Sequence, residues 1–148
     1  FLTRKKHGSK ETLYLGNLNA RRDWGHAKDY TEMQWRIMQQ KKPKDYVIAT
    51  GHAYSVKQFV NIAADYLGMK ILWSGKGLNE IGYTFNKNKK EILIKIDKKY
   101  FRPNEVEYLK GDASKALKDL KFKPKYSFKA LVEDMIDNDL LEAKKELE

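Results

Sequence analysis

The sequence contains no cysteine, so it can form neither a disulfide bond nor a thiolate metal site. Its three histidines, His7, His26 and His52, stand far apart, and none has a partner at the spacing typical of a metal site. No apolar run approaches the roughly 18 to 20 residues that cross a bilayer, and no signal-peptide pattern opens the chain. We therefore expect a soluble, cytoplasmic protein with no metal and no membrane partner.

The chain also lacks an initiating methionine. It begins at Phe1 with an apolar and then basic string, which indicates the interior of a longer polypeptide. Its 148 residues, of which 41% are hydrophobic, suffice for one core. We expect a single unit over residues 1–148, a charged tail at 142–148, and a missing amino-terminal part.

Arginine is scarce, although the chain is basic. The formal net charge is +10, yet only five of the thirty cations are arginine. The lysines are spread along the chain among acidic residues, which favours a solvated surface and no nucleic-acid partner. A polynucleotide-binding domain is an alternative, and it would bind with steeply salt-dependent affinity. The few arginines are more informative, because a planar guanidinium suits a diphosphate.

The pattern of apolar residues in the first half predicts an α/β fold. Strands are expected at 12–16, 46–50 and 70–73, and helices at 29–40 and 55–68. Asp29 with Glu32 forms a capping-box pattern, and Ser55 with Gln58 forms another. Gly68 is expected to end the second helix. Strands joined by helices in this rhythm are typical of a parallel sheet covered by helices.

The second half continues with one more strand and two helices. Residues 91–96 alternate like an edge strand, and a short helix is expected to begin at Asp112 or Ala113 and to end near Leu120. Ser127 is placed to cap a last helix, whose apolar stripe runs to Leu140.

A cofactor loop and a catalytic pair are not apparent. Gly75 and Gly77 follow a predicted strand, but Glu80 occupies the place of the third glycine of a dinucleotide fingerprint. Tyrosine followed four residues later by lysine occurs at 66/70 and at 83/87, where a helix end and an Asn-rich loop intervene. Both pairs are therefore interpreted as chance matches, since acid–base chemistry needs the two side chains on one helical face.

Two loops carry residues that packing does not explain. In the first, from Gly16 to His26, Arg21 and Arg22 precede Asp23 and Trp24. It follows a predicted strand, and α/β proteins bind ligands beyond the carboxyl ends of strands. The alternative is an Arg–Asp ion pair beneath a packed Trp24.

In the second loop, Arg102 and Glu105 flank Pro103. Arginine can clamp phosphate oxygens, and a carboxylate can accept hydrogen bonds from a ribose diol. Here too, a simple ion pair is the alternative.

The segment from Leu15 to Tyr30 resembles the signature stretch of GDP-mannose 4,6-dehydratases, which belong to the extended short-chain dehydrogenases. Further matches follow in the family's order: Tyr46–Gly51, Gly77–Glu80 with Gly82, Tyr100–Pro103 with Glu105 and Val106, and Leu120 with Phe122–Pro124. The resemblance covers the chain up to about Leu141. It implies distal parallel strands and helices of a Rossmann-like sheet plus the smaller α/β substrate-binding domain.

The resemblance also implies a site and a reaction. Leu2, Lys5, Arg22, Arg102 and Glu105 match residues that hold the GDP part of GDP-mannose in the family. The product would be GDP-4-keto-6-deoxymannose plus water. NADP would be held by the absent amino-terminal half, so no catalytic residue is expected in this chain. A complete protein is expected to be a homo-oligomer. The alternative is a free-standing GDP or GDP-sugar binding module without catalysis.

The chain departs from the family pattern at two places. The family has a longer segment than this chain between Lys5 and Leu13, so the match of Lys5 depends on how that segment is aligned. After Gly51, the family often has Glu-Thr-His where this chain has His52, Ala53 and Tyr54.

Overall fold

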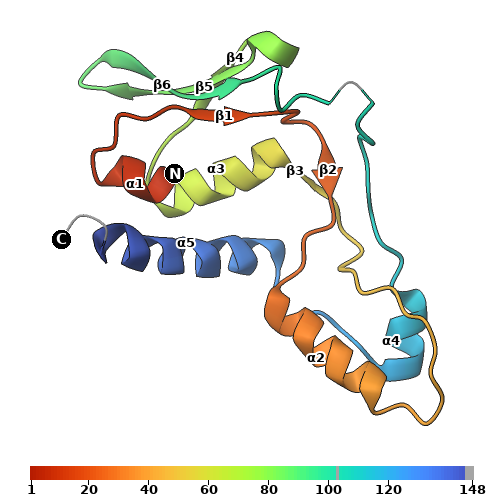
Figure 1. Cartoon of the computed structure of the whole chain (residues 1–148). Coiled ribbons are helices and arrows are strands. Elements are labelled where there is room, and N and C mark those ends of the chain that lie inside the picture. The colour runs from red at the N-terminus through yellow and green to blue at the C-terminus, as the bar shows by residue number, and fades with distance from the viewer. Residues whose placement is uncertain (103, 146–148) are drawn as a thin grey trace.

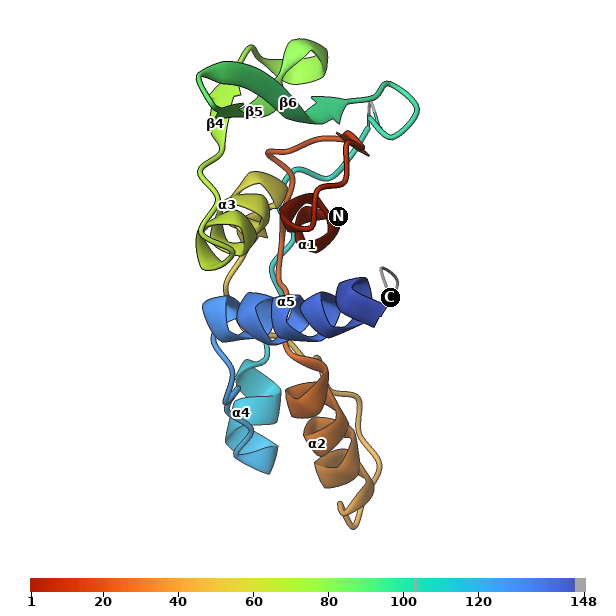
Figure 2. The same cartoon turned by 90° about the vertical axis from the view of Figure 1, so that its left-hand side faces the viewer.

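The computed structural model describes residues 1–102 and 104–145, and shows a layered body with a protruding lobe. A sheet covers helices α1 (Leu2–Lys6) and α3 (Val56–Tyr66), and α5 (Phe128–Lys145) lies beneath them (Figures 1 and 2). The lobe, formed by α2 (Ala27–Met38) and α4 (Ser114–Leu120), extends from the far side of α5. The α/β class expected from the sequence is confirmed.

The sheet of the body has four strands in the order β1 (Leu13–Leu15), β6 (Lys89–Ile96), β5 (Ile81–Asn86) and β4 (Leu72–Ser74). β1 and β6 are parallel, with Leu13 opposite Ile94, whereas the other two pairs are antiparallel. The strands expected near 12–16, 70–73 and 91–96 are therefore confirmed. The expectation that 91–96 forms an edge strand is wrong, because β6 is paired on both sides.

The core of the body lies where α3 meets the sheet and α5. Its fully or nearly fully buried members include Ala64 and Val132 at the helix interface, and Leu93 on β6. The start of α3 was predicted correctly, because Ser55 and Gln58 form the reciprocal capping box. Gly68 follows the helix end with a φ of 72°, a left-handed conformation that glycine adopts without strain.

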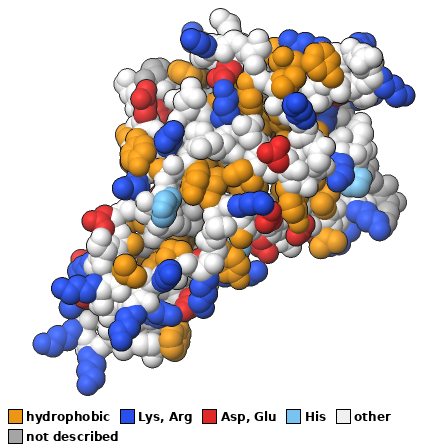
Figure 3. Space-filling model, turned by 180° about the vertical axis from the view of Figure 1, so that it is seen from behind, with side chains coloured by type: hydrophobic (Ala, Val, Ile, Leu, Met, Phe, Trp, Pro, Cys, Tyr) orange, Lys and Arg blue, Asp and Glu red, His pale blue; other side chains and the backbone are white. Residues whose placement is uncertain are grey.

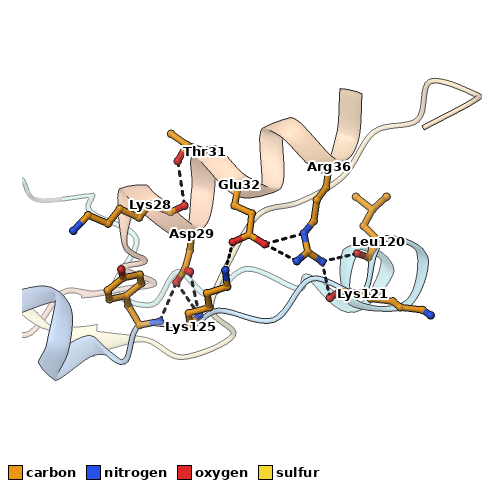
Figure 4. Close-up of polar contacts among 9 residues, drawn as sticks. Lys28, Asp29, Thr31, Glu32, Arg36, Leu120, Lys121 and Lys125 are labelled. Atoms are coloured by element: carbon orange, nitrogen blue, oxygen red, sulfur yellow. Dashed lines mark hydrogen bonds and ion pairs between the residues drawn. The ribbon is translucent and has the colours of Figure 1, made fainter. Parts of the chain in front are cut away.

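The lobe has its own small core, formed by Met33 of α2 with Ala116, Leu120 and Phe122. Arg36 of α2 binds Glu32 and donates hydrogen bonds to the carbonyl oxygens of Leu120 and Lys121 beside α4 (Figure 4). Lysine and arginine side chains gather over the lobe at the lower left of Figure 3. The two helices were expected, and their contact joins distant parts of the chain.

The start of α2 differs from the expectation. His26, not Asp29, is the N-cap, and its Nδ1 accepts a hydrogen bond from the Lys28 amide. The buried carboxylate of Asp29 instead accepts hydrogen bonds from the backbone amides of Lys125 and Tyr126 (Figure 4). At the other end of that connection, Ser127 caps α5 as predicted, through a hydrogen bond from the Ala130 amide.

The strand expected at 46–50 is not formed. No strand of the described residues pairs with this run, which has no regular secondary structure, and Val47 is 54% exposed. Strand formation depends on a neighbour that supplies hydrogen bonds, which the local pattern cannot specify. The parallel pairing expected for the sheet is therefore limited to β1 and β6 within the described part of the chain.

Body and lobe are joined by a narrow connection that we call the strap. It consists of β2 (Arg21–Arg22), its antiparallel partner β3 (Tyr54–Ser55) and the segment 105–111, which runs beside β2 (Figure 1). Arg21 donates its amide to Glu107 and accepts a hydrogen bond from the Leu109 amide. The strap thus fixes the two loops singled out by the sequence against each other.

Candidate functional site

Arg22 and Glu105 form the centre of the candidate site. The Arg22 guanidinium lies 2.7 Å from Glu105 Oε1 and donates a hydrogen bond of 2.8 Å to the Val106 carbonyl oxygen. Their side chains are 25% and 19% exposed, so the pair is partly shielded from solvent. A carboxylate that is already paired with arginine has oxygen lone pairs left for further donors.

A cavity of about 390 Å³ lies beside this pair. Gly16 and Asn17 border it after β1, and Lys99 and Tyr100 border it after β6. Because β1 and β6 are parallel, the cavity lies beyond their carboxyl ends, where α/β proteins commonly bind ligands.

Arg102 lines the same cavity, together with Arg22 and Glu105. Within residues 1–102 and 104–145, the Arg102 side chain forms no ion pair, and it is exposed. Pro103, between Arg102 and Glu105, lies outside the described residues. Among the described residues, the cavity therefore has one ion-paired guanidinium, that of Arg22, one guanidinium without an ion pair, that of Arg102, and the carboxylate of Glu105.

Both ion-pair alternatives from the sequence named the wrong partners. Arg22 pairs with Glu105 and not with the neighbouring Asp23, and Glu105 pairs with Arg22 and not with Arg102. Trp24 is indeed packed: its ring stacks on Phe128 at 5.5 Å and meets the edge of Phe59 at 5.2 Å.

Asp23, which directly follows β2, joins the segment at Thr50 and Gly51 to Gly111 of the strap. Oδ1 accepts hydrogen bonds from the amide and hydroxyl of Thr50, and Oδ2 accepts from the amides of Gly51 and Gly111. Burial alone would raise the pKa of Asp23, but these hydrogen bonds outweigh it and hold the pKa below its ordinary value of 3.8. This role could not be predicted from the sequence, because none of the donors is near Asp23 in the chain.

The close approach at Gly111 shows how tightly these segments meet. A Cβ atom at Gly111 would lie 2.2 Å from the Cβ of Ala49, so a larger residue would push the segment 105–111 away from Ala49. On one side of this contact lies a larger cavity of about 1050 Å³, which Trp24, His52 and Tyr126 help to line. The sequence offered no signal for it, because its walls come from four separate segments.

Leu2 and Lys5 lie away from the Arg22 cavity. Leu2 is buried in the body core against Ala63 and Val132. Lys5 is paired with Glu91 at 2.7 Å, and its Nζ also donates a hydrogen bond to the Glu11 carbonyl oxygen. The structure thus brings together three of the five predicted site residues and leaves these two apart.

The described residues do not fit a dinucleotide cofactor. Gly75 packs against the backbone of Asn79, and Gly77 begins the short 3₁₀ helix η1 (Gly77–Asn79). Tyr66 ends α3 two residues before the turn at Gly68, so it does not share a helical face with Lys70. Tyr83 lies in β5, and Lys87 lies in the following turn.

Solved structures share the architecture of this chain. The chain superposes on the RMD protein of Pseudomonas aeruginosa, solved with NADPH, with a TM-score of 0.73 at 15% identity, over 95% of this chain and 40% of that one. It superposes on the dTDP-glucose 4,6-dehydratase of Bacillus anthracis, solved with NAD, with a TM-score of 0.67 at 16% identity, over 98% and 39%. At these identities the likeness shows the fold alone: the chain has the architecture of about two fifths of each of these proteins.

Sequence comparison identifies the family. The model of the GDP-mannose 4,6-dehydratase family matches residues 1–135, so the chain belongs to this family. Over 133 residues it is 46% identical to the GDP-mannose 4,6 dehydratase of Cricetulus griseus and 47% identical to that of Dictyostelium discoideum. These matches cover 90% of this chain but only 35% and 37% of the relatives. The chain therefore spans little more than a third of the length of these relatives.

Proposed function

We propose that this chain supplies the GDP-sugar-binding part of a GDP-mannose 4,6-dehydratase. The observation that carries the proposal is the meeting of Arg22, Arg102 and Glu105 around one cavity beyond the carboxyl ends of β1 and β6. The three residues come from two distant loops, and both loops match the family.

Each of the three residues has a distinct part in the proposed site. Arg102, which has no ion-pair partner among the described residues, is the cation available to the diphosphate. Arg22 is held by Glu105 and by the Val106 carbonyl oxygen, so it adds fixed positive charge. Glu105 keeps acceptor capacity for the ribose hydroxyls. Leu2 and Lys5 remain proposed contacts of the guanosine part, although in this structure both are engaged elsewhere.

The reaction itself is assigned to residues outside this chain. NADP, when bound in the complete protein, would remove a hydride from the sugar and return it. The described residues offer no fitting cofactor loop and no Tyr–Lys pair on a helix. We also propose that the complete protein is a lyase that acts on GDP-mannose and is a cytoplasmic homo-oligomer. No helix of the described residues is long and apolar enough to span a membrane.

Titration of GDP into the Arg102→Ala variant tests the binding proposal. Loss of a charge-assisted contact should cost on the order of 1.5 to 3 kcal/mol, or roughly a 10- to 150-fold weaker affinity. Isothermal titration calorimetry of the unaltered chain and the variant measures this difference. The matched control is Arg36→Ala, which removes an arginine that joins the lobe helices far from the cavity.

The control should lower the melting temperature and leave the GDP affinity of the folded molecules unchanged. If the unaltered chain binds no GDP, or if Arg102→Ala binds it equally well, the proposed site is wrong. A free-standing binding module without catalysis remains the second candidate. This second candidate predicts the same titration result. It differs in predicting that the natural protein, when expressed, has the intact mass of this chain alone.

A further inference from the structure

A second groove, at the opposite edge of the sheet from the Arg22 cavity, is lined by lysines. It has a volume of about 1020 Å³ and lies between the β5–β6 turn, the segment after α1 and the end of α3. Lys10 precedes β1, and Lys89 begins β6, so the groove lies at the amino-terminal ends of these parallel strands. It is therefore separate from the Arg22 cavity, although Lys5, which we keep as a proposed contact of the guanosine part, also lines this groove.

The charge of this groove is far less balanced than that of the whole chain. Six of its lining residues are lysines, and Glu91 is its one acidic residue. In the whole chain, by contrast, there are 30 cations and 20 acidic residues. Glu91 is already paired with Lys5, and Lys90 lies over the Tyr83 ring at 4.1 Å.

The four other lysines have no such partner. Within residues 1–102 and 104–145, no ion pair or hydrogen bond engages the ammonium groups of Lys10, Lys70, Lys87 and Lys89. Like charges that gather on one groove repel each other, and a bound polyanion would relieve that repulsion.

The backbone at Lys87 is an independent observation. Lys87 and Asn88 form the turn between β5 and β6 with φ angles of 47° and 64°. Two-residue turns of this kind favour asparagine and glycine, because left-handed backbone strains a residue with a longer side chain. Strain that persists at one residue is a reason to look for a role of its side chain. Here the strained residue is one of the cations that line the groove.

An exposed aromatic ring completes the groove. Phe85 lines it, is 57% exposed and meets Tyr83 edge to face at 5.7 Å. A flat base can stack on such a ring while its phosphates contact lysines. The volume is at the upper end of the range typical of small-molecule sites.

We propose that this groove binds a nucleotide with two or three phosphates, separately from the Arg22 cavity. The four unpaired lysines would contact the phosphates, and Phe85 would contact the base. The proposal does not depend on the proposed function of the Arg22 cavity.

The test is a calorimetric titration of the chain with ATP, and separately with tripolyphosphate, at two salt concentrations. Lys70→Gln/Lys89→Gln should weaken ATP binding roughly 5- to 25-fold, since each exposed cation contributes up to about 1 kcal/mol. Lys41→Gln/Lys42→Gln is the matched control, because it removes the same charge from exposed lysines beyond α2. It should leave the affinity nearly unchanged. ATP should also bind more tightly than tripolyphosphate.

A second variant separates binding from folding. Lys87→Gly relieves the backbone strain, so it should raise the melting temperature and yet weaken ATP binding. Equal losses of ATP affinity in both double variants would mean that ATP is attracted by the overall positive charge of the chain, and this would overturn the proposal. If Arg102→Ala were the one variant that lost ATP binding, the nucleotide would lie in the Arg22 cavity, and the proposal would be overturned. Preference for a single-stranded oligonucleotide over ATP would also overturn it.

Discussion

At the scale of single residues, Asp23 and Asp29 form a matched pair. Both lie in the segment that carries the family signature, and each carboxylate accepts hydrogen bonds from several backbone amides. Asp23 holds the strap beside Arg22, whereas Asp29 joins α2 to the connection before α5. The two residues therefore differ mainly in what they hold in place.

We expect Asp23→Asn to lower both the stability and the GDP affinity of the chain. An amide retains one oxygen acceptor and turns an NH₂ group toward backbone donors, so the loss should be on the order of 2 kcal/mol of unfolding free energy. The segment 105–111 would lose the hydrogen bond from its Gly111 amide to residue 23, and GDP affinity should fall several-fold. Denaturant unfolding and calorimetry measure the two effects.

Asp29→Asn provides the control, because it should destabilise the protein comparably and leave GDP affinity per folded molecule unchanged.

The pH dependence of stability gives a second test of Asp23. The folded pKa of Asp23 lies below 3.8, so the stabilisation is present above that ordinary value and is lost as the pH falls through the lowered folded pKa. Asp23→Asn should flatten the stability curve in this acidic range. If both variants lose GDP affinity equally, Asp23 does not position the site.

At the scale of elements, the ends of α3 rest on local contacts. Ser55 Oγ accepts the Gln58 amide, and the Gln58 side chain accepts the Ser55 amide. We expect Ser55→Ala to cost about 1 kcal/mol of stability, because an amide at the helix start loses its acceptor. Thermal unfolding measures the loss.

Ser74→Ala, at the exposed end of β4, is the control and should change stability little. An equal loss in the two variants would mean that the capping box contributes nothing of its own.

The same distinction between local and distant contacts explains what the sequence could predict. The capping box at Ser55 and the end of α3 at Gly68 depend on neighbouring residues and were predicted correctly, whereas the capping box expected at Asp29 did not form. The segment at 46–50 was not predicted correctly, because a strand needs a neighbour that its own residues do not name. The edge position assigned to β6 was wrong for the same reason.

The candidate site shows a similar division. Family resemblance selected Arg22, Arg102 and Glu105, and the structure places all three at one cavity. The family resemblance could not reveal that Arg22 pairs with Glu105, 83 positions away. Nor could it reveal the Lys5 pair with Glu91, which holds that lysine at the other edge of the sheet. The binding roles of these residues stay predictions.

At the scale of the whole molecule, the chain should bind without catalysing. We expect no conversion of GDP-mannose by the 148-residue chain, even with NADP present, because the described residues offer neither a cofactor loop nor a catalytic pair. Product formation can be followed by liquid chromatography, with a full-length relative as the positive control. Measurable turnover by this chain would contradict the division of roles proposed above.

The lobe has a consequence for how the protein is made. Its core needs α2 and α4 together, and the bond from Arg36 to Leu120 joins residues 84 positions apart. Ribosomes add about 5 to 20 residues per second, so α2 must wait on the order of ten seconds for its partner during synthesis. Throughout that interval Met33, fully buried in the finished molecule, has no apolar cover from α4. The nascent chain is therefore most exposed to association with chaperones, or with other chains, between the emergence of α2 and that of α4.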